Sequence, residues 1–499
     1  MSLKQVLRNV YSQWSLQAIR AAISFTTAVV VARILGPERY GAAMSVVVFS
    51  LVFRLVLNPG FTLSAIRHIS VYKGSGRDYT PLVAGYLLYR LAAGIPLAAL
   101  FYLASGFFAS LAGVPQYADA YRVYSVSIAL MAFYEAMRAY LHGIGRVDMA
   151  NLYFTISFVT ASISSLALVL QGLGVYGYVL GLVVGNALHS AIYALTLRDC
   201  LRACARAGVR GAVEGLKIIA PLGMSVLATQ VANFLHMWLD KAVVLGLLGV
   251  HSLGLYSVAL KLAGTVDAAK NAVTVALRPY YGTVYGASGL APIRSKVFRA
   301  SKVMSLAFAP PVLVLAGLAP ALVSAVYGPE YADAWPIVAV HLAYTAATSF
   351  TAAYGGIPLI LEARREIVGR SVVSACTSLA LELGVVTLGL GGLGVVLGRD
   401  LGALAAFLYV YLALYRRLRL EFDSRSWLLG TIMGASMLAV TALVLLLAPH
   451  IWYLAPLVAA LVYVGIAKLL KPLDRADMRV VREALGAKFS KFVEAWLLE

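Results

Sequence analysis

Residues 172–181 read GLGVYGYVLG and residues 389–398 read GLGGLGVVLG, so one segment recurs 217 positions later in the chain. Two shorter segments recur in the same order. Tyr117-Ala118-Asp119-Ala120-Tyr121 returns as Tyr331-Ala332-Asp333-Ala334-Trp335, and Leu35-Gly36 with Gly41 returns as Leu248-Gly249 with Gly254. Three matches in one order, at nearly one offset, indicate that the chain consists of two homologous halves.

The composition places both halves in a membrane. Of 499 residues, 61% are hydrophobic and 13% are charged, and the mean hydropathy is +0.84. At about 20 residues per transmembrane helix, this length holds about 12 to 14 spans and leaves no room for a large water-soluble domain, which excludes a soluble enzyme. The three cysteines, Cys200, Cys204 and Cys376, match no metal-ligand spacing, so no metal site, disulfide or cofactor is predicted.

Fourteen apolar runs are candidate transmembrane helices. They cover about residues 11–35, 41–66, 81–108, 119–141, 150–171, 177–197, 217–239, 252–277, 303–326, 335–360, 367–388, 393–414, 427–447 and 451–469. Six runs fall in each half. The sequence therefore predicts an all-α polytopic membrane protein of about 14 helices, with two parallel six-helix repeats and two additional C-terminal helices.

Four divisions follow from these runs. We expect an N-terminal lobe over residues 1–210, a C-terminal lobe over 211–420, helices 13 and 14 over 421–470, and a basic tail over 471–499. In the tail, apolar side chains recur at helical spacing among basic ones, which is typical of an amphipathic helix on a membrane surface.

The cationic loops predict the orientation. Most Lys and Arg residues, including Arg278 and Arg370, lie on one side of the predicted spans, so the positive-inside rule places both termini in the cytoplasm of a cell-membrane protein. The formal net charge of +19 then indicates contact with anionic lipids and not with nucleic acid, because no basic soluble domain exists. The first run contains Gln13, Gln17 and Arg20 and is interpreted as a retained span rather than a signal peptide. We expect a monomer.

Four runs carry polar residues on one helical face, which cannot face lipid because an ionised group near the midplane costs about 2.5–3.5 kcal/mol. These residues are Gln13, Gln17, Arg20, Ser24 and Thr27 in run 1; Ser50, Arg54, Asn58 and Thr62 in run 2; Ser225, Thr229, Asn233, His236 and Asp240 in run 7; and Asp267, Lys270, Asn271 and Thr274 in run 8. We predict that they line a polar cavity, with Gln17, Asn58, Asn233 and Asn271 in its wall. Pro59-Gly60 is expected to bend or interrupt run 2.

Arg20, Arg54 and Arg90 lie in the first three runs, where Glu135 of run 4 is the only nearby acid. Unpaired cations in an apolar cavity indicate an anionic substrate, and a guanidinium suits phosphate because it donates two hydrogen bonds at once. The alternatives are a structural pairing of Arg20 or Arg54 with Glu135 and a snorkelling Arg90.

Asp240, Asp267 and Glu382 are candidates for ion coupling or gating, and sodium, a proton or the membrane potential are all compatible as the driving force. The repeat offset pairs Arg54 with Asp267, which predicts a gate between the two residues. The alternatives are a local Asp240–Lys241 pair and neutralisation of Asp267 by Lys270 three residues away.

The segments listed here resemble the polysaccharide-biosynthesis flippases that export lipid-linked oligosaccharide units. They are Ala32-Arg33-Ile34-Leu35-Gly36-Pro37-Glu38-Arg39-Tyr40-Gly41, His142-Gly143-Ile144-Gly145-Arg146, Trp238-Leu239-Asp240 with Gly254-Leu255-Tyr256-Ser257-Val258-Ala259, and Tyr327-Gly328-Pro329-Glu330-Tyr331. Lipid II flippases and MATE multidrug exporters belong to the same superfamily of two six-helix lobes.

The resemblance implies a V-shaped alternating-access transporter, not an enzyme. Its substrate would be a polyprenyl-phosphate-linked or polyprenyl-pyrophosphate-linked saccharide, moved from the cytoplasmic to the outer leaflet for cell-surface polysaccharide or glycoprotein synthesis. By span and depth, Arg20, Arg54 and Lys270 match cationic phosphate ligands of lipid II flippases, and helices 13 and 14 would hold the lipid tail.

Three alternatives stay open. A MATE-like exporter of organic cations would favour acids over arginines in its cavity. A membrane-embedded glycosyltransferase or polymerase would need a large outer loop for its catalytic residues, whereas outer connections such as residues 36–41 and 172–177 are short. The third alternative is a non-transporting lipid scramblase or a structural partner.

Overall fold

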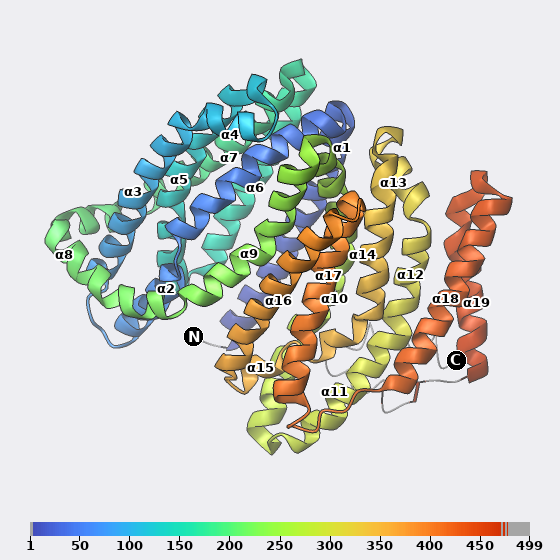
Figure 1. Cartoon of the computed structure of the whole chain (residues 1–499). Coiled ribbons are helices and arrows are strands. Elements are labelled where there is room, and N and C mark those ends of the chain that lie inside the picture. Colours follow the sequence, from blue (N-terminus) through green and yellow to red (C-terminus); the bar gives the residue numbers. More distant parts are fainter. Residues whose placement is uncertain (1–2, 471–472, 475–476, 478–499) are drawn as a thin grey trace. The chain divides into compact units, whose positions relative to one another are not determined.

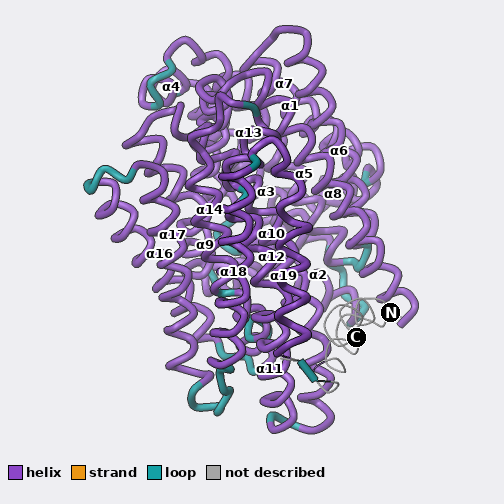
Figure 2. The backbone as a smooth tube through the Cα atoms, turned by 90° about the vertical axis from the view of Figure 1, so that its right-hand side faces the viewer, coloured by secondary structure: helices purple, strands orange, loops and turns teal. Residues whose placement is uncertain are grey.

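The protein is described by a computed structural model that covers residues 3–470, 473–474 and 477; the side chains of residues 3–15, 228, 229, 233, 236, 237 and 449 are not described. In this part of the chain every regular element is a helix (Figures 1 and 2). The predicted all-α class is confirmed. Apart from Leu473, Asp474 and Asp477, the predicted amphipathic tail lies outside the described residues.

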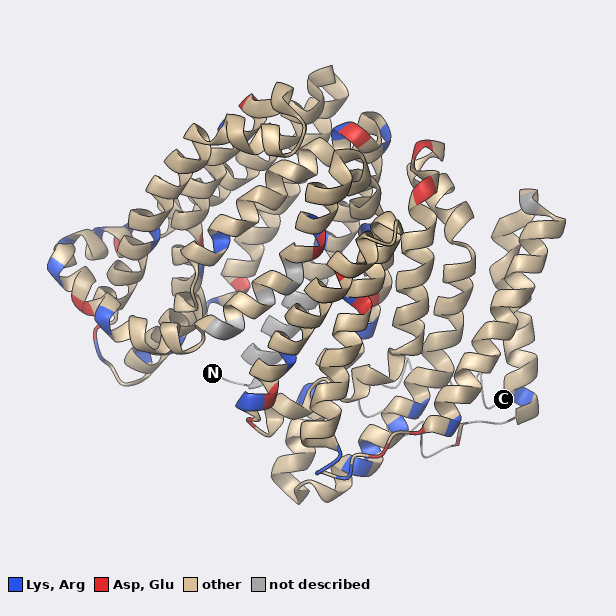
Figure 3. Cartoon of the chain, viewed as in Figure 1, with Lys and Arg blue, Asp and Glu red and all other residues tan. Residues whose placement is uncertain are grey.

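The described helices are long and apolar enough to form a polytopic membrane protein. Nine helical stretches could cross a membrane by length and composition, or ten if the bent pair Pro329–Ala347 and Ser349–Ile360 is one span. Two stretches, Leu16–Leu57 and Val147–Thr196, each hold two predicted runs. Lys, Arg, Asp and Glu gather on α8 and α11, and long stretches of most other helices carry none of these four residue types (Figure 3).

The chain forms two compact units, Met1–Ser257 and Val258–Glu499. Unit 1 contains α1 (Leu3–Leu57), α2 (Phe61–Gly74), α3 (Thr80–Leu103), α4 (Ser105–Leu111), η1 (Pro115–Tyr117), α5 (Ala118–Gly143), α6 (Val147–Leu168), η2 (Val169–Leu173), α7 (Gly174–Thr196), α8 (Arg198–Ser225), α9 (Leu227–Val243), η3 (Val244–Leu248) and the start of α10 (Gly249–Ser288). Its core joins α2, α3, α5 and α8 through side chains such as Phe61, Tyr86, Met137 and Ile219.

Unit 2 contains the rest of α10, α11 (Ala291–Val303), η4 (Met304–Phe308), α12 (Ala309–Gly317), α13 (Ala319–Tyr327), η5 (Pro329–Ala334), α14 (Trp335–Ala347), η6 (Ser349–Ala353), α15 (Ile357–Ile360), α16 (Arg364–Val386), α17 (Gly391–Val410), η7 (Tyr411–Tyr415), α18 (Ser424–Leu447), η8 (Pro449–Leu454) and α19 (Ala455–Leu470). One core packs α18 and α19 against α12, through Met437 and Tyr463 among others. A second core packs α10, α11 and α17 around Tyr354.

The two halves share backbone features at matched positions, which confirms the repeat. Gly36 and Gly249 are both left-handed, with φ of 71° and 79°, at the two links where one helix passes into the next. Only glycine adopts this conformation without strain. Gly185 of α7 and Gly402 of α17 also match, since an ideal Cβ at these residues would lie 2.3 Å from Ala161 and 2.1 Å from Ser378. Each glycine therefore permits the close approach of a helix pair.

The halves differ at one position in run 2 and its partner, run 8. α1 ends at Leu57 and α2 begins at Phe61, so the helix is interrupted at Pro59-Gly60 as predicted. α10 continues without interruption through Ala272-Val273, the matched residues. The cause is local, because Pro59 lacks an N–H and Gly60 has a φ of 108°.

Candidate functional site

Arg90 of α3 stabilises the interruption between α1 and α2. Its side chain is buried, and it donates from Nη1 to the carbonyl of Leu57 (2.9 Å), from Nη2 to Met131 (3.0 Å) and from Nε to Ala132 (3.3 Å). Asn58 spans the gap, because its Oδ1 accepts a hydrogen bond from the Thr62 N–H at 3.1 Å. The snorkelling alternative for Arg90 is wrong, since its guanidinium bonds to the helix-end carbonyl of Leu57 and to two carbonyls within α5, inside the unit.

Unit 1 contains a cavity of about 180 Å³ at this interruption. Its lining residues are Arg54, Leu57, Asn58, Arg90, Met131 and Glu135. Two predicted phosphate ligands, Arg54 and Arg90, therefore share one cavity with the predicted polar residue Asn58. Arg54 lies in the last turn of α1 and is exposed, so its five N–H donors can reach a bound group.

Glu135, the acid of this cavity, pairs with Arg138 one turn further along α5. The Oε1–Nη1 distance is 3.5 Å, and both side chains are about a quarter exposed. The structure therefore pairs Glu135 with Arg138, and not with Arg20 or Arg54 as the alternative had it. The lining residues of the cavity carry a net positive charge, because Arg54 and Arg90 outnumber the one carboxylate, Glu135.

Arg20 lies outside the lining of this cavity and connects α1 to α6. Its Nη1 donates to the hydroxyl of Thr155 at 2.5 Å, and its Cζ is 5.1 Å from the ring centre of Phe154. Arg138 lies 4.8 Å from the same ring, so one aromatic ring contacts two guanidinium groups. The predicted wall residue Gln17 is exposed on α1, and the side chain of Asn233 lies outside the described residues.

Asp240, a candidate ion ligand, is buried in a local network. It accepts hydrogen bonds from Lys241 Nζ (3.1 Å) and from the Tyr256 hydroxyl (3.0 Å). Glu382, the candidate in unit 2, is buried against Gly398 of α17, where an ideal Cβ would lie 2.9 Å from its Cγ. The contact between Asp240 and Lys241 is the local ion pair that the sequence offered as the alternative to an ion-coupling role for Asp240.

Unit 2 contains a second cavity, of about 210 Å³, with three cations in its wall. The lining residues are Lys270, Asn271, Thr274, Arg278, Tyr344, Thr348, Thr351, Ala352, Tyr354, Gly355, Arg370, Ala403, Leu404, Phe407, Val410 and Tyr415. Lys270 donates to the Thr348 hydroxyl at 2.9 Å. The lining includes no Asp or Glu, so its charge favours an anion.

Sequence reasoning missed Arg278 and Arg370, which it counted among the cytoplasmic charges. Lys270, Thr274 and Arg278 are spaced by four residues and share one face of α10, so helical periodicity could have found Arg278. Arg370 lies on α16, and no pattern in the sequence connects α16 to α10.

A third group of residues, Asp267, His341 and Asp400, forms a hydrogen-bonded triad in unit 2. His341 Nε2 lies 2.8 Å from Asp267 Oδ2, and His341 Nδ1 lies 2.9 Å from Asp400 Oδ1. The hydroxyl of Thr345 donates to Asp267 Oδ1 at 2.9 Å. Asp267 thus bonds to α14, while Lys270 bonds to Thr348. His341 was not predicted as a site residue, because a single histidine in an apolar run is usually a packing residue.

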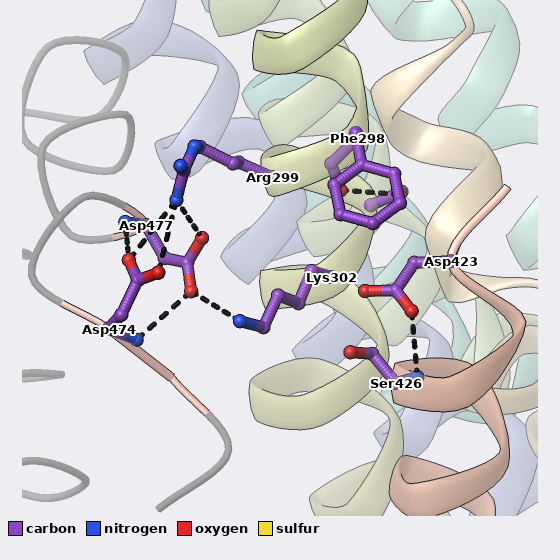
Figure 4. A network of polar contacts seen from close by, with 8 residues as sticks. Phe298, Arg299, Lys302, Asp423, Ser426, Asp474 and Asp477 are labelled. Atoms are coloured by element: carbon purple, nitrogen blue, oxygen red, sulfur yellow. Dashed lines mark hydrogen bonds and ion pairs between the residues drawn. The ribbon is translucent and has the colours of Figure 1, made fainter. Parts of the chain in front are cut away.

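Two further acidic residues, Asp474 and Asp477, form ion pairs with cations of α11. Arg299 Nη1 lies 2.9 Å from Asp477 Oδ1 and 3.1 Å from Asp474 Oδ1, and Lys302 Nζ lies 2.7 Å from Asp477 Oδ2 (Figure 4). Asp477 is buried and Asp474 is exposed. Among the described residues, no group of three or more His, Cys, Asp or Glu side chains is arranged to hold a metal ion.

Comparison with solved structures shows which known proteins share this fold. The lipid II flippase MurJ in an inward closed conformation aligns with a TM-score of 0.69 at 15% identity, over 92% of this chain and 98% of the other. An inward-facing MATE multidrug resistance transporter of the MOP superfamily aligns at 0.58 and 18%, over 85% and 98%. The eukaryotic MATE transporter AtDTX14 aligns at 0.53 and 15%, over 86% and 99%. The fold of this chain is therefore similar to that of MurJ and of the two MATE transporters.

The family model described as "Polysaccharide biosynthesis protein" matches residues 30–336, more than half of the chain. The protein belongs to this polysaccharide biosynthesis family. A search of curated proteins finds no sequence match. The predicted polysaccharide-biosynthesis family is therefore confirmed.

Proposed function

We propose that the protein translocates a polyprenyl-phosphate-linked or polyprenyl-pyrophosphate-linked oligosaccharide from the cytoplasmic to the outer leaflet of the cell membrane. Cell-surface polysaccharide or glycoprotein synthesis would consume the product. Both termini are cytoplasmic in this proposal, anionic lipids contact the basic loops, and the protein acts as a monomer.

The cationic cavities carry the proposal. Each unit has a cavity among apolar helices that is lined by at least two cations, with Arg54 and Arg90 in unit 1 and Lys270, Arg278 and Arg370 in unit 2. An anion that enters such a cavity loses most of its water, and charged donors offset that loss. Ionised groups within membrane-spanning helices are costly, so their presence in the walls of cavities favours an anionic substrate.

The cavity in unit 2 also suits a sugar. Tyr344, Tyr354, Phe407 and Tyr415 contribute aromatic rings to the wall, and Thr348 and Thr351 contribute hydroxyls. Aromatic faces pack against the apolar faces of pyranose rings, while hydroxyls bond to the ring substituents. Phosphate and saccharide recognition can therefore share one cavity wall.

Two parallel ligand titrations distinguish this function from cation export. The full-length protein in detergent is titrated with a short polyprenyl pyrophosphate carrying one N-acetylhexosamine, and separately with tetraphenylphosphonium, while the thermal unfolding midpoint is followed. We expect the anionic lipid to raise the midpoint and the organic cation to leave it unchanged, because a ligand stabilises only the state it binds. Stabilisation by the organic cation alone would instead support the alternative function, a MATE-like exporter of organic cations.

A further inference from the structure

The carboxylates of Asp267 and Asp400 lie on opposite sides of the His341 ring. Both ring nitrogens are within hydrogen-bond distance of carboxylate oxygens, at 2.8 Å for Nε2 and at 2.9 and 3.0 Å for Nδ1. The side chains of His341 and Asp400 are each 5% exposed, and that of Asp267 is 33% exposed. Two members of the triad are thus enclosed by the protein, and the third is partly exposed at its surface.

Counting donors shows that this arrangement needs an additional proton. An ionised carboxylate only accepts hydrogen bonds, and a neutral imidazole has one N–H donor and one acceptor nitrogen. Two carboxylates and a neutral imidazole can therefore form only one of the two contacts. Both contacts form when His341 is an imidazolium or when one carboxyl is protonated, and in either case the triad binds one proton and has a net charge of −1.

Loss of that proton to water changes both charge and packing. The triad charge becomes −2, and one nitrogen lone pair then faces a carboxylate oxygen at under 3 Å, so one hydrogen bond is replaced by repulsion. His341 of α14 then loses its contact either with Asp267 on α10 or with Asp400 on α17. Proton binding thus biases two arrangements of these helices.

Among the described residues, three charged or titratable groups face the triad. Lys270 comes from α10, Arg399 from α17 and Tyr344 from α14, and Arg370 of α16 in turn faces Lys270 and Tyr344. Lys270 is one helical turn from Asp267, and with Arg370 it also lines the cationic cavity of unit 2. A triad at −2 attracts Lys270 more strongly than one at −1, which withdraws a cation from the cavity and weakens anion binding there.

We infer that Asp267, His341 and Asp400 form a proton-binding site, and that one proton is bound and released there in each transport cycle. Asp267 is the entry point in this inference, because its side chain is the partly exposed member of the triad. The proton-loaded triad leaves Lys270 available to the substrate, and the unloaded triad draws it away. The coupling rests on the proposed translocation, whereas the proton site itself does not.

The proton site is tested without substrate. Full-length protein with [15N]histidine is studied by NMR, with the His341 resonances assigned by their loss in His341→Gln, and protonated carboxyl groups are followed by infrared spectroscopy. At about pH 7 we expect a doubly protonated His341 or a protonated carboxyl band. In Asp267→Asn/Asp400→Asn both signatures should vanish, because a neutral imidazole can donate to one carboxamide oxygen and accept from the other NH₂ group. The control His251→Gln should change neither. Absence of both signatures in the wild type would overturn the site.

The coupling is tested in proteoliposomes with the fluorescent polyprenyl pyrophosphate saccharide as probe. One coupled proton should shift the transmembrane distribution of the probe by up to about tenfold for a gradient of one pH unit. The double Asn variant should move the probe without this shift, and a sodium gradient should not replace the pH gradient. Wild-type movement that follows sodium and ignores pH would overturn the coupling. A wild type that moves no probe would refute the proposed function, while the spectroscopic experiment would still decide the proton site.

Discussion

The Nη1 atom of Arg90 lies 2.9 Å from the carbonyl oxygen of Leu57, the last residue of α1. This contact places a buried guanidinium at the end of an interrupted helix, beside the cavity that Arg54 and Asn58 line. Arg90 therefore shapes the cavity wall through three backbone carbonyls, whereas Arg54 presents an exposed guanidinium to the cavity. The two arginines should respond differently to substitution.

Arg90→Met should destabilise the protein. The Leu57 carbonyl at the end of α1 loses its donor, which costs about 1–3 kcal/mol in water-soluble proteins, and two carbonyls within α5 lose an additional charged donor, so a total loss of roughly 2–4 kcal/mol is expected. Arg54→Met removes an exposed side chain and should change stability by less than about 0.5 kcal/mol. Thermal unfolding of both variants in one detergent measures the difference. Equal midpoints would mean that Arg90 does not stabilise the helix end.

Gly402→Ala should disturb the α16–α17 pair. The added methyl group would lie 2.1 Å from Ser378 Oγ and 2.8 Å from the Ser378 backbone nitrogen, so backbone must shift, at a cost of roughly 1–3 kcal/mol. Gly384→Ala is the matched control on α16, because its methyl group meets no atom within 4 Å and alanine favours helix by up to about 1 kcal/mol. The two variants should shift the unfolding midpoint in opposite directions, and a shared direction would contradict the close approach.

Asp477→Asn should loosen α11. Asp477 is buried between Arg299 and Lys302, and removing its charge leaves two cations without their shared partner, at a cost of roughly 2 kcal/mol or more. Asp474→Asn changes an exposed pair worth less than about 1 kcal/mol. Hydrogen exchange of the α11 amides should therefore quicken by tenfold or more, on the order expected from that energy, only in the Asp477 variant. An equal response of the two variants would show that burial of Asp477 is unimportant.

Much of the fold could be predicted because it depends on local properties of the sequence. Apolar runs locate the helices, the interruption follows from Pro59-Gly60, and the glycines Gly36 and Gly249 show the repeat and the left-handed links. Such features need only the composition or conformation of neighbouring residues.

The sites were predicted less completely because they depend on which helices pack together. Helical spacing places Lys270 and Asn271 in a polar face, and both line a cavity. No local pattern shows that His341 reaches Asp267 and Asp400, or that Arg90 turns its guanidinium to the carbonyl groups of α1 and α5. Residues 74 and 59 positions from His341 supply its two carboxylates, and sequence spacing carries no information about that contact.

The predicted gate between Arg54 and Asp267 stays a prediction. Within its own unit, Arg54 lines a cavity, and Asp267 bonds to His341 and Thr345. If the two residues form a gate, reversing both charges with Arg54→Asp and Asp267→Arg should restore the balance of conformations that each single change disturbs, as measured by cysteine accessibility. Unchanged accessibility in both single variants would exclude the gate.

The central claim is that the protein translocates an anionic, lipid-linked saccharide with Arg54 as a phosphate ligand. The most direct measurement is the rate at which a fluorescent polyprenyl pyrophosphate saccharide crosses the bilayer of proteoliposomes, read by its accessibility to a membrane-impermeant quencher. We predict rapid crossing with the wild type, loss of at least about a hundredfold in Arg54→Ala, as expected when a desolvated anion loses a charge-assisted partner worth about 3 kcal/mol, and partial recovery in Arg54→Lys. Wild-type crossing no faster than in protein-free liposomes, or full activity of Arg54→Ala, would contradict the account.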